Sequence, residues 1–154
     1  MSQHTAKIEW KGWTPEFALG KYSRVHTWSF DGGLTVTASA APGVVPAPFV
    51  DPAGIDPEEA FVASISSCHM LTYLHVARRA GFQIESYVDE AVGDMAKNDK
   101  GIPWVATVTL NPQIVYVGDK RPSHEEEAQL HHKAHDGCYV SQSVKSDVKV
   151  AGFE

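Results

Sequence analysis

The sequence predicts an α+β fold, in which strand-forming and helix-forming segments occur in blocks along the chain. Segments rich in β-branched and aromatic residues occur before residue 41 and again between residues 82 and 118, and each block precedes a segment with helix start and stop signals. With 154 residues, 43% of them hydrophobic, the chain is long and apolar enough for a single domain, residues 1–154, with its own core.

The first block predicts a hairpin. Residues 6–10 alternate weakly between polar and apolar side chains and form the first candidate strand. Residues 21–30 are rich in β-branched and aromatic residues, and the turn sequence Phe-Asp-Gly-Gly then leads back into residues 34–40. Residues 41–55 contain four prolines, so we expect an extended loop there.

The second block predicts another hairpin. Residues 82–96 and 102–118 flank the sequence Asn-Asp-Lys-Gly, which is typical of a turn between two antiparallel strands. Residues 146–153 form the last candidate strand and close the fold.

The first predicted helix, residues 57–80, has clear ends. Asp56 is its N-cap candidate, Glu59 completes a capping box, and Gly81 follows the last turn. Its first half is apolar almost all round, which predicts that the helix is buried. Four small side chains would let another backbone approach it closely: Ala63, Ser64, Ser66 and Ser67.

Both cysteines of the chain occur at predicted helices. Cys68 lies in the middle of the first helix. Cys138 follows the second helix, which Ser123 and Glu126 begin with a capping box and Gly137 ends. Two thiols that are far apart in sequence, each held by a helix, suggest a thiol-based redox pair. The alternative for Cys68 is a small hydrophobic residue in a buried helix, a common environment for free cysteine.

A nucleophilic cysteine must react as a thiolate. A free cysteine has a pKa of about 8.5, so a nearby cation has to lower it. The dipole of the first helix contributes little, because Cys68 lies well beyond the first turn. We therefore expect the cation to come from elsewhere in the fold.

Composition limits the partners and the location. The net charge is −6 and no basic stripe is present, so we expect no nucleic-acid partner. Residues 1–12 contain no apolar run and are not expected to be a signal peptide, and no segment is expected to be long enough to span a bilayer. The default expectation is a cytoplasmic protein without a membrane partner, in which cysteines are reactive or buried more often than permanently bridged.

Three stretches of sequence resemble the OsmC/Ohr family of thiol peroxidases, and the likeness extends from about residue 6 to about residue 150. They are YSRVHTWSFDGG, DPEEAFVASISSC with the following HMLTYLHVARRAGF, and KAHDGCYVSQSV. The glycine-rich turn looks closer to OsmC-type than to Ohr-type members. The resemblance implies two antiparallel sheets around two central helices and an intertwined homodimer. The apolar first helix favours the dimer independently, since a monomer of this size could hardly cover it on every side.

The resemblance also implies the roles of four residues. Cys68 would be the peroxidatic cysteine, which becomes a sulfenic acid, and Cys138 the resolving cysteine, which forms a disulfide with it. Arg24 would hold the thiolate, and Glu58 would orient Arg24. Glu58 and Cys68 are separated by about 15 Å along a straight helix, so Arg24 would have to bridge them, or Arg24 and Glu58 would come from a partner chain. Without the resemblance, Glu58 complements a helix dipole and Arg24 is a surface residue of a strand.

The implied reaction consumes organic or lipid hydroperoxides and is completed by a small dithiol or a dithiol protein. It needs neither a cofactor nor a metal. The apolar side chains of Val45, Phe49 and Val50, together with Trp28, could wall an apolar channel to Cys68, and such a channel would favour bulky peroxides over hydrogen peroxide.

Two other classes of function remain open. The first is a binding protein that has the fold without turnover. The second is a zinc-binding protein: His131 and His135 are four residues apart on one helix face, and Cys138 follows closely. His132, His69 or a water would then be the fourth ligand.

Overall fold

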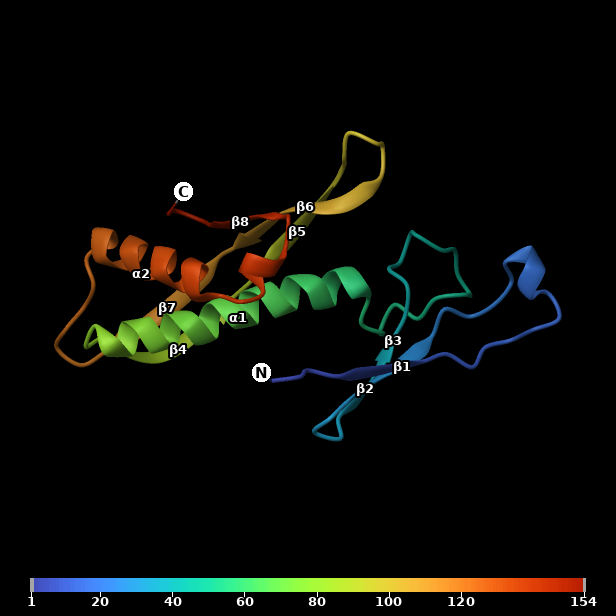
Figure 1. The fold of residues 1–154 in the computed structure, drawn as a ribbon, viewed down its shortest axis with the longest axis horizontal. Helices are drawn as coiled ribbons and strands as arrows, with labels where there is room; N and C mark the ends of the chain where they lie inside the picture. The colour runs from blue at the N-terminus through green and yellow to red at the C-terminus, as the bar shows by residue number, and fades with distance from the viewer. Residues whose placement is uncertain (1, 154) are drawn as a thin grey trace. The chain divides into compact units, whose positions relative to one another are not determined.

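The structure is a computed structural model, and it describes residues 2–153. The chain forms two compact units, Met1–Ala60 and Phe61–Glu154, and each is described by itself (Figure 1). The prediction of a single domain stays a prediction.

The first unit contains a three-stranded antiparallel sheet with the order β1-β2-β3. Its elements are β1 (Ala6–Glu9), the 3₁₀ turn η1 (Phe17–Leu19), β2 (His26–Phe30) and β3 (Thr35–Ala38). The predicted hairpin is confirmed: Gly33 has a φ of 86°, and its N–H donates to the Phe30 carbonyl at 3.0 Å. Only glycine adopts this backbone conformation without strain, which explains its place in the turn.

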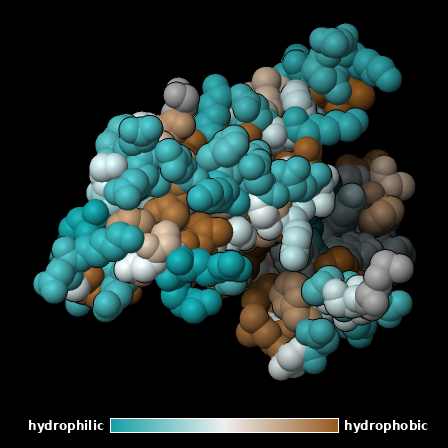
Figure 2. Space-filling model, turned by 60° about the vertical axis from the view of Figure 1, so that its left-hand side comes forward, coloured by the Kyte–Doolittle hydropathy of each residue, from teal (hydrophilic) through white to brown (hydrophobic). Residues whose placement is uncertain are grey.

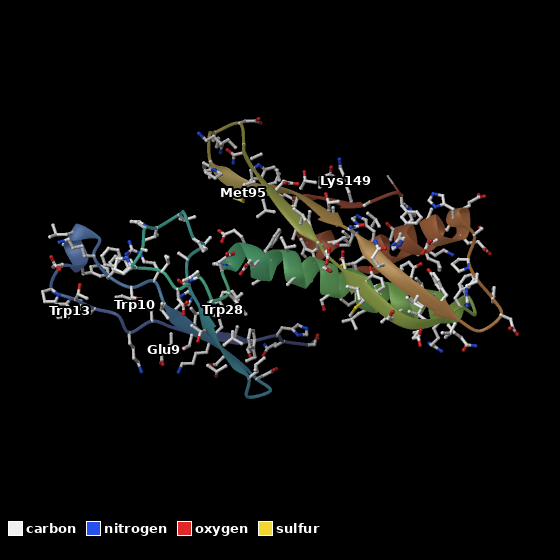
Figure 3. The ribbon with its side chains drawn as sticks, turned by 180° about the vertical axis from the view of Figure 1, so that it is seen from behind. Glu9, Trp10, Trp13, Trp28, Met95 and Lys149 are labelled. Atoms are coloured by element: carbon white, nitrogen blue, oxygen red, sulfur yellow. The ribbon has the colours of Figure 1, made fainter. Side chains whose placement is uncertain are left out.

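The second strand is shorter than predicted, because residues before His26 take part in an aromatic cluster instead. The rings of Phe17 and Tyr22 stack at 4.5 Å, and Trp10 meets Tyr22 edge-on at 5.7 Å. The indole N–H of Trp10 donates to the Ser23 carbonyl at 2.7 Å. Figure 3 shows Trp10 and Trp13 on the segment between β1 and β2.

The helix α1 (Pro57–Arg79) follows the predicted loop. Its predicted capping box is confirmed: the Glu59 N–H donates to the Asp56 carboxylate at 2.8 Å, and the Asp56 N–H donates to the Glu59 carboxylate at 3.2 Å. Gly81 ends the helix with a φ of 86°.

In the second unit, α1 is buried along one face only. The buried residues recur every four positions and are Ile65, His69, Tyr73 and Ala77. The side chain of Leu71 is 61% exposed, so one chain leaves part of this helix uncovered. The homodimer stays a prediction. The surface in Figure 2 is mostly hydrophilic with separate hydrophobic patches.

One expectation about α1 is wrong. The helix is long and apolar enough, by length and composition, to cross a membrane, with a mean hydropathy of 1.2. Core helices of soluble proteins meet the same criterion, and the buried residues of α1 pack against other parts of the protein.

The second unit contains two further sheets and the second helix. Its elements after α1 are β4 (Gln83–Asp89), β5 (Val92–Lys97), β6 (Pro103–Leu110), β7 (Pro112–Val117), α2 (His124–Gly137), the 3₁₀ turn η2 (Ser141–Ser143) and β8 (Asp147–Val150). Strands β4 and β7 pair antiparallel, whereas β5, β6 and β8 form a separate sheet in that order. In Figure 3, Met95 lies on β5 and Lys149 on β8.

The α+β class with two helices is confirmed, but the sheets differ from the two antiparallel sheets predicted. There are three sheets among residues 2–153, and β8 runs parallel to β6. Both long strands predicted between residues 82 and 118 are interrupted, and the two interruptions meet at Asp89. Its carboxylate accepts the N–H of Asn111 at 2.7 Å and the hydroxyl of Ser66, so Asn111 bonds to a side chain instead of a neighbouring strand. These contacts attach α1 to the break that separates the two sheets.

Two apolar clusters fill the second unit. One joins α1, α2 and the β4–β7 sheet, and its buried members are Tyr73, Ala77, Phe82, Leu130 and Ala134. The other joins α1 to β6 through Ile65, Val108 and Leu110. Each fully buried aliphatic side chain contributes about 1.5–3 kcal/mol, so the clusters fix both helices relative to these strands.

Candidate functional site

The two cysteines lie next to each other in the second unit, although they are far apart in sequence. Both are free thiols; Cys68 is partly exposed in the middle of α1, and Cys138 is fully buried at the C-cap of α2. The thiol of Cys138 is close enough to that of Cys68 to raise its pKa. The fold thus places one accessible sulfur near one inaccessible sulfur.

A close approach of α2 to α1 positions this pair. A Cβ atom added to Gly137 would lie only 2.9 Å from Cγ2 of Thr72, so a larger residue at 137 would require either the Thr72 side chain or the end of α2 to shift. The hydroxyl of Thr72 donates to the carbonyl of Cys68 at 2.9 Å. Cys138 therefore begins the next segment directly beside the turn of α1 that carries Cys68.

Cys68 opens into a cavity of about 810 Å³ between the two helices. Ser64, Leu71 and His75 line it from α1, Lys133 from α2, and Tyr139 from the segment after α2. The volume is in the range typical of small-molecule sites. A molecule in this cavity would reach Cys68, while Cys138 would stay covered.

Within the second unit, the environment of Cys68 disfavours the thiolate. Burial raises the pKa of the Cys68 thiol, and the interaction with Cys138 raises it further. The backbone N–H groups of Val140 and Tyr139 lower it, but their effect is smaller than that of burial. Lys133 is a cation in the wall of the same cavity, but it is not among the main groups that shift the pKa of Cys68.

Cys138 has a partner that sequence reasoning missed. Its Sγ accepts hydrogen bonds from the hydroxyl of Ser141 at 3.1 Å and from the Ser141 N–H at 3.4 Å. The sequence signal was a serine three residues after the cysteine, at the start of a short turn. Tyr139, Val140 and Ser141 thus supply three successive N–H groups that act on the two sulfurs.

The other two predicted site residues belong to the first unit. Arg24 donates from Nη1 to the carbonyls of Gly20, at 2.8 Å, and of Tyr22, and its guanidinium lies 3.7 Å from the centre of the Tyr22 ring. It precedes β2, so its interpretation as a strand residue is wrong. Glu58 is exposed in the first turn of α1, where a carboxylate complements the helix dipole. The roles of Arg24 and Glu58 stay predictions.

The histidines form a pair instead of a metal site. Nε2 of His69 and Nδ1 of His131 share a hydrogen bond of 3.0 Å, and the two buried rings are stacked. Burial lowers the pKa of His69 to about 4 and that of His131 to about 3, so both imidazoles are neutral near pH 7. Within residues 2–153, no three His, Cys, Asp or Glu side chains are arranged to hold a metal ion. The zinc alternative built on His131, His135 and Cys138 therefore gains no support.

Comparison with known families assigns the chain. The family described as OsmC-like protein matches residues 50–151, a range that includes both cysteines and Glu58 but not Arg24. The chain belongs to the OsmC-like family. No curated protein matches the sequence.

Solved structures of this family share the fold. An OsmC-like protein of unknown function from Vibrio cholerae is 46% identical over 97% of this chain and 98% of its own, with a TM-score of 0.93. An organic hydroperoxide resistance protein from Elizabethkingia anophelis is 20% identical over 97% of this chain and 93% of its own, with a TM-score of 0.71. OhrB of Bacillus subtilis, also named for organic hydroperoxide resistance, is 22% identical over 95% of this chain and 96% of its own, with a TM-score of 0.66.

Proposed function

We propose that this OsmC-like protein is a thiol-dependent peroxidase that reduces organic hydroperoxides. The proximity of an accessible thiol, Cys68, to a buried thiol, Cys138, carries the proposal. Membership of a family that includes proteins named for organic hydroperoxide resistance supports it.

The two sulfurs suit a two-step oxidation. The Cys68 thiolate attacks the terminal oxygen of the hydroperoxide, so that an S–O bond forms, the O–O bond breaks, and the departing alkoxide takes a proton to become an alcohol. The Cys138 sulfur then attacks the Cys68 sulfenic acid. An S–S bond forms, the S–O bond breaks, and water leaves with the thiol proton. A small dithiol or a dithiol protein returns both cysteines to the reduced state.

Arg24 is the proposed activating cation. Burial raises the pKa of Cys68, so the thiolate needs a positive charge to be populated near neutral pH. A guanidinium remains charged at all relevant pH values and can also stabilise the departing alkoxide. Glu58 would orient it, either within one chain or across a homodimer.

The cavity at Cys68 supports a preference for organic peroxides. Leu71 and Val76 are apolar side chains in its wall, and burying alkyl surface is worth about 25 cal/mol per Å². Hydrogen peroxide has no alkyl surface to bury. The additional channel formed by Val45, Phe49, Val50 and Trp28 stays part of the proposal, as does a cytoplasmic location.

The decisive experiment compares wild type with Cys68→Ser and Cys138→Ser in a dithiothreitol-coupled assay with cumene hydroperoxide and hydrogen peroxide. Cys68→Ser should consume no peroxide, because the attacking sulfur is gone. In the absence of dithiothreitol, which would reduce the sulfenic acid directly, Cys138→Ser should complete one oxidation and then accumulate over-oxidised Cys68, which mass spectrometry detects. Full activity of Cys68→Ser would refute the mechanism. A kcat/KM for hydrogen peroxide equal to that for cumene hydroperoxide would refute the apolar preference alone.

The role of Arg24 has a separate test. In a Cys138→Ser background, Arg24→Ala should slow the alkylation of Cys68 by iodoacetamide near neutral pH, because a smaller fraction is thiolate. Arg121→Ala is a matched control, since Arg121 also donates from Nη1 to a backbone carbonyl, that of Gly118 at 2.7 Å. Unchanged alkylation in Arg24→Ala would point to Lys21 as the cation instead.

A further inference from the structure

We infer that Ser141 accommodates the Cys138 sulfur as a departing thiolate, so that the reductant attacks the disulfide at Cys68. The inference rests on the proposed Cys68–Cys138 disulfide. It assigns Ser141 as a positioning residue and fixes the direction in which the disulfide opens.

The geometry of Ser141 suits this role. Both its hydroxyl and its N–H donate to the Cys138 sulfur, at 3.1 and 3.4 Å. Ser141 begins η2, and the adjacent N–H of Gln142 donates to the carbonyl of Cys138 at 3.0 Å, so the turn is closed onto the cysteine whose sulfur it contacts. Ser141 is only 8% exposed, which keeps water from competing for these hydrogen bonds.

The accessibility of the two sulfurs decides which one is attacked. Cys68 lines the cavity and is partly exposed, whereas Cys138 is 0% exposed. An incoming thiolate must approach the sulfur it attacks, and only Cys68 can be approached through the cavity. Cys138 is then the leaving group.

A leaving thiolate at a buried position needs compensation. Negative charge inside a protein is costly unless hydrogen-bond donors surround it. Hydrogen bonds to a charged acceptor are about twice as strong as those to a neutral one, so the two donors of Ser141 favour the charge that develops on Cys138.

The step balances as a two-electron reduction by a dithiol. One thiolate of the dithiol bonds to the Cys68 sulfur, the Cys68–Cys138 bond breaks, and its electron pair stays on Cys138. The second thiol of the dithiol then displaces Cys68 and closes the reductant's own disulfide. Cys68 and Cys138 end as thiols after taking up the two protons released by the dithiol.

The first experiment measures the reduction of a preformed disulfide. Diamide oxidises the full-length protein, and dithiothreitol reduction is followed by acid quenching and mass spectrometry. Ser141→Ala should slow reduction about tenfold, the effect of losing one hydrogen bond to a charged group, while Ser141→Thr should keep the wild-type rate. Ser143→Ala is the matched control and should also keep it, because the Ser143 hydroxyl donates to the Tyr139 carbonyl in the same turn.

Equal rates for wild type and Ser141→Ala would overturn the inference. So would a Ser141→Thr rate as low as that of Ser141→Ala, because the hydroxyl would then not be responsible. Absence of any disulfide after diamide treatment would overturn both this inference and the resolving role of Cys138. If the disulfide forms and shows these rates while cumene hydroperoxide is not consumed, the peroxidase proposal fails and the assignment of Ser141 stands.

The second experiment identifies the attacked sulfur. Oxidised wild type is treated briefly with 2-mercaptoethanol, which has only one thiol, and free thiols are then alkylated. Mass spectrometry should find the mercaptoethanol adduct on Cys68 and the alkyl group on Cys138. If reduction depended only on a loosened η2 turn, the mercaptoethanol adduct would appear on both sulfurs. The adduct on Cys138 would overturn the inference.

Discussion

Lowering the pH from about 8 to about 5 is expected to destabilise the second unit through the buried pair His69 and His131. Burial lowers the pKa of His69 to about 4 and that of His131 to about 3, and each ring lies beside the other. Of the charged groups near His69, His135 lowers its pKa and Asp89 raises it, both less than burial. Since the folded-state pKa values are depressed, the stabilising contribution is fully present above about pH 6.5 and is lost as the pH falls towards the folded-state values.

The magnitude follows from the difference between the folded and unfolded states. In the unfolded chain each imidazole has a pKa of about 6.5, so it is protonated at about pH 5, whereas the folded pair stays neutral at that pH. Each histidine then lowers the free energy of unfolding by about 1.4 kcal/mol per pH unit below about 6.5. The pair therefore lowers it by about 4 kcal/mol at about pH 5. That is a large part of the free energy of unfolding of a typical domain.

Urea unfolding followed by far-UV circular dichroism measures this effect, because both helices meet at the pair. In His131→Gln, only one buried imidazole remains, and the loss of unfolding free energy between the two pH values should fall to about half. His75→Gln is the matched control: its side chain is exposed on α1 and is not part of the pair, so this variant should keep the full loss of unfolding free energy between the two pH values. A wild-type unfolding free energy that does not change between the two pH values would refute the reasoning, as would a His131→Gln variant with the full pH dependence.

Three further predictions concern stability and are checked by the same urea unfolding at about pH 8. Tyr116→Phe should lower the free energy of unfolding by about 1–3 kcal/mol, because the Tyr116 hydroxyl lies 2.6 Å from that of Tyr73 and donates to Glu127 at 2.8 Å. An unchanged urea midpoint would show that the buried Tyr73 hydroxyl finds another partner. Leu130→Ala should cost about 2–5 kcal/mol, because Leu130 is 4% exposed and belongs to the cluster between the helices; a loss below about 1 kcal/mol would mean that the site collapses around the smaller side chain. Asp56→Ala should cost about 1 kcal/mol through loss of the α1 capping box, and Asp56→Asn should restore most of it; equal stability of Asp56→Ala and wild type would contradict this.

Local signals predicted most of the elements. The capping boxes at Asp56 and Ser123 and the glycine turn after Phe30 depend on residues within a few positions of one another, so their sequence spacing is sufficient. The interruption of the second pair of strands was not predictable in this way. It depends on the Asp89 carboxylate, which accepts from Ser66 and Asn111, both about 22 residues away in sequence.

The candidate site was predictable to a similar degree. The two cysteines were identified as a pair from their helical settings and the family resemblance, and the structure brings them close together. The two donors from Ser141 could not be foreseen, because they depend on the conformation of the η2 turn. The pairing of His69 with His131 depends on how α1 and α2 pack, and helical spacing alone suggested a zinc site there instead.

The close approach of Gly137 to Thr72 sets the spacing of α1 and α2, and with it the distance between the two sulfurs. Because Gly137 has no side chain, α2 ends as near to α1 as a methyl group of Thr72 allows, and Cys138 is the next residue. A larger residue at 137 would have to displace the Thr72 side chain or push the last turn of α2 outwards, and the second change would carry the Cys138 sulfur away from Cys68. Close approach of the thiols is therefore a property of helix spacing, and it can be lost in a protein that keeps both cysteines.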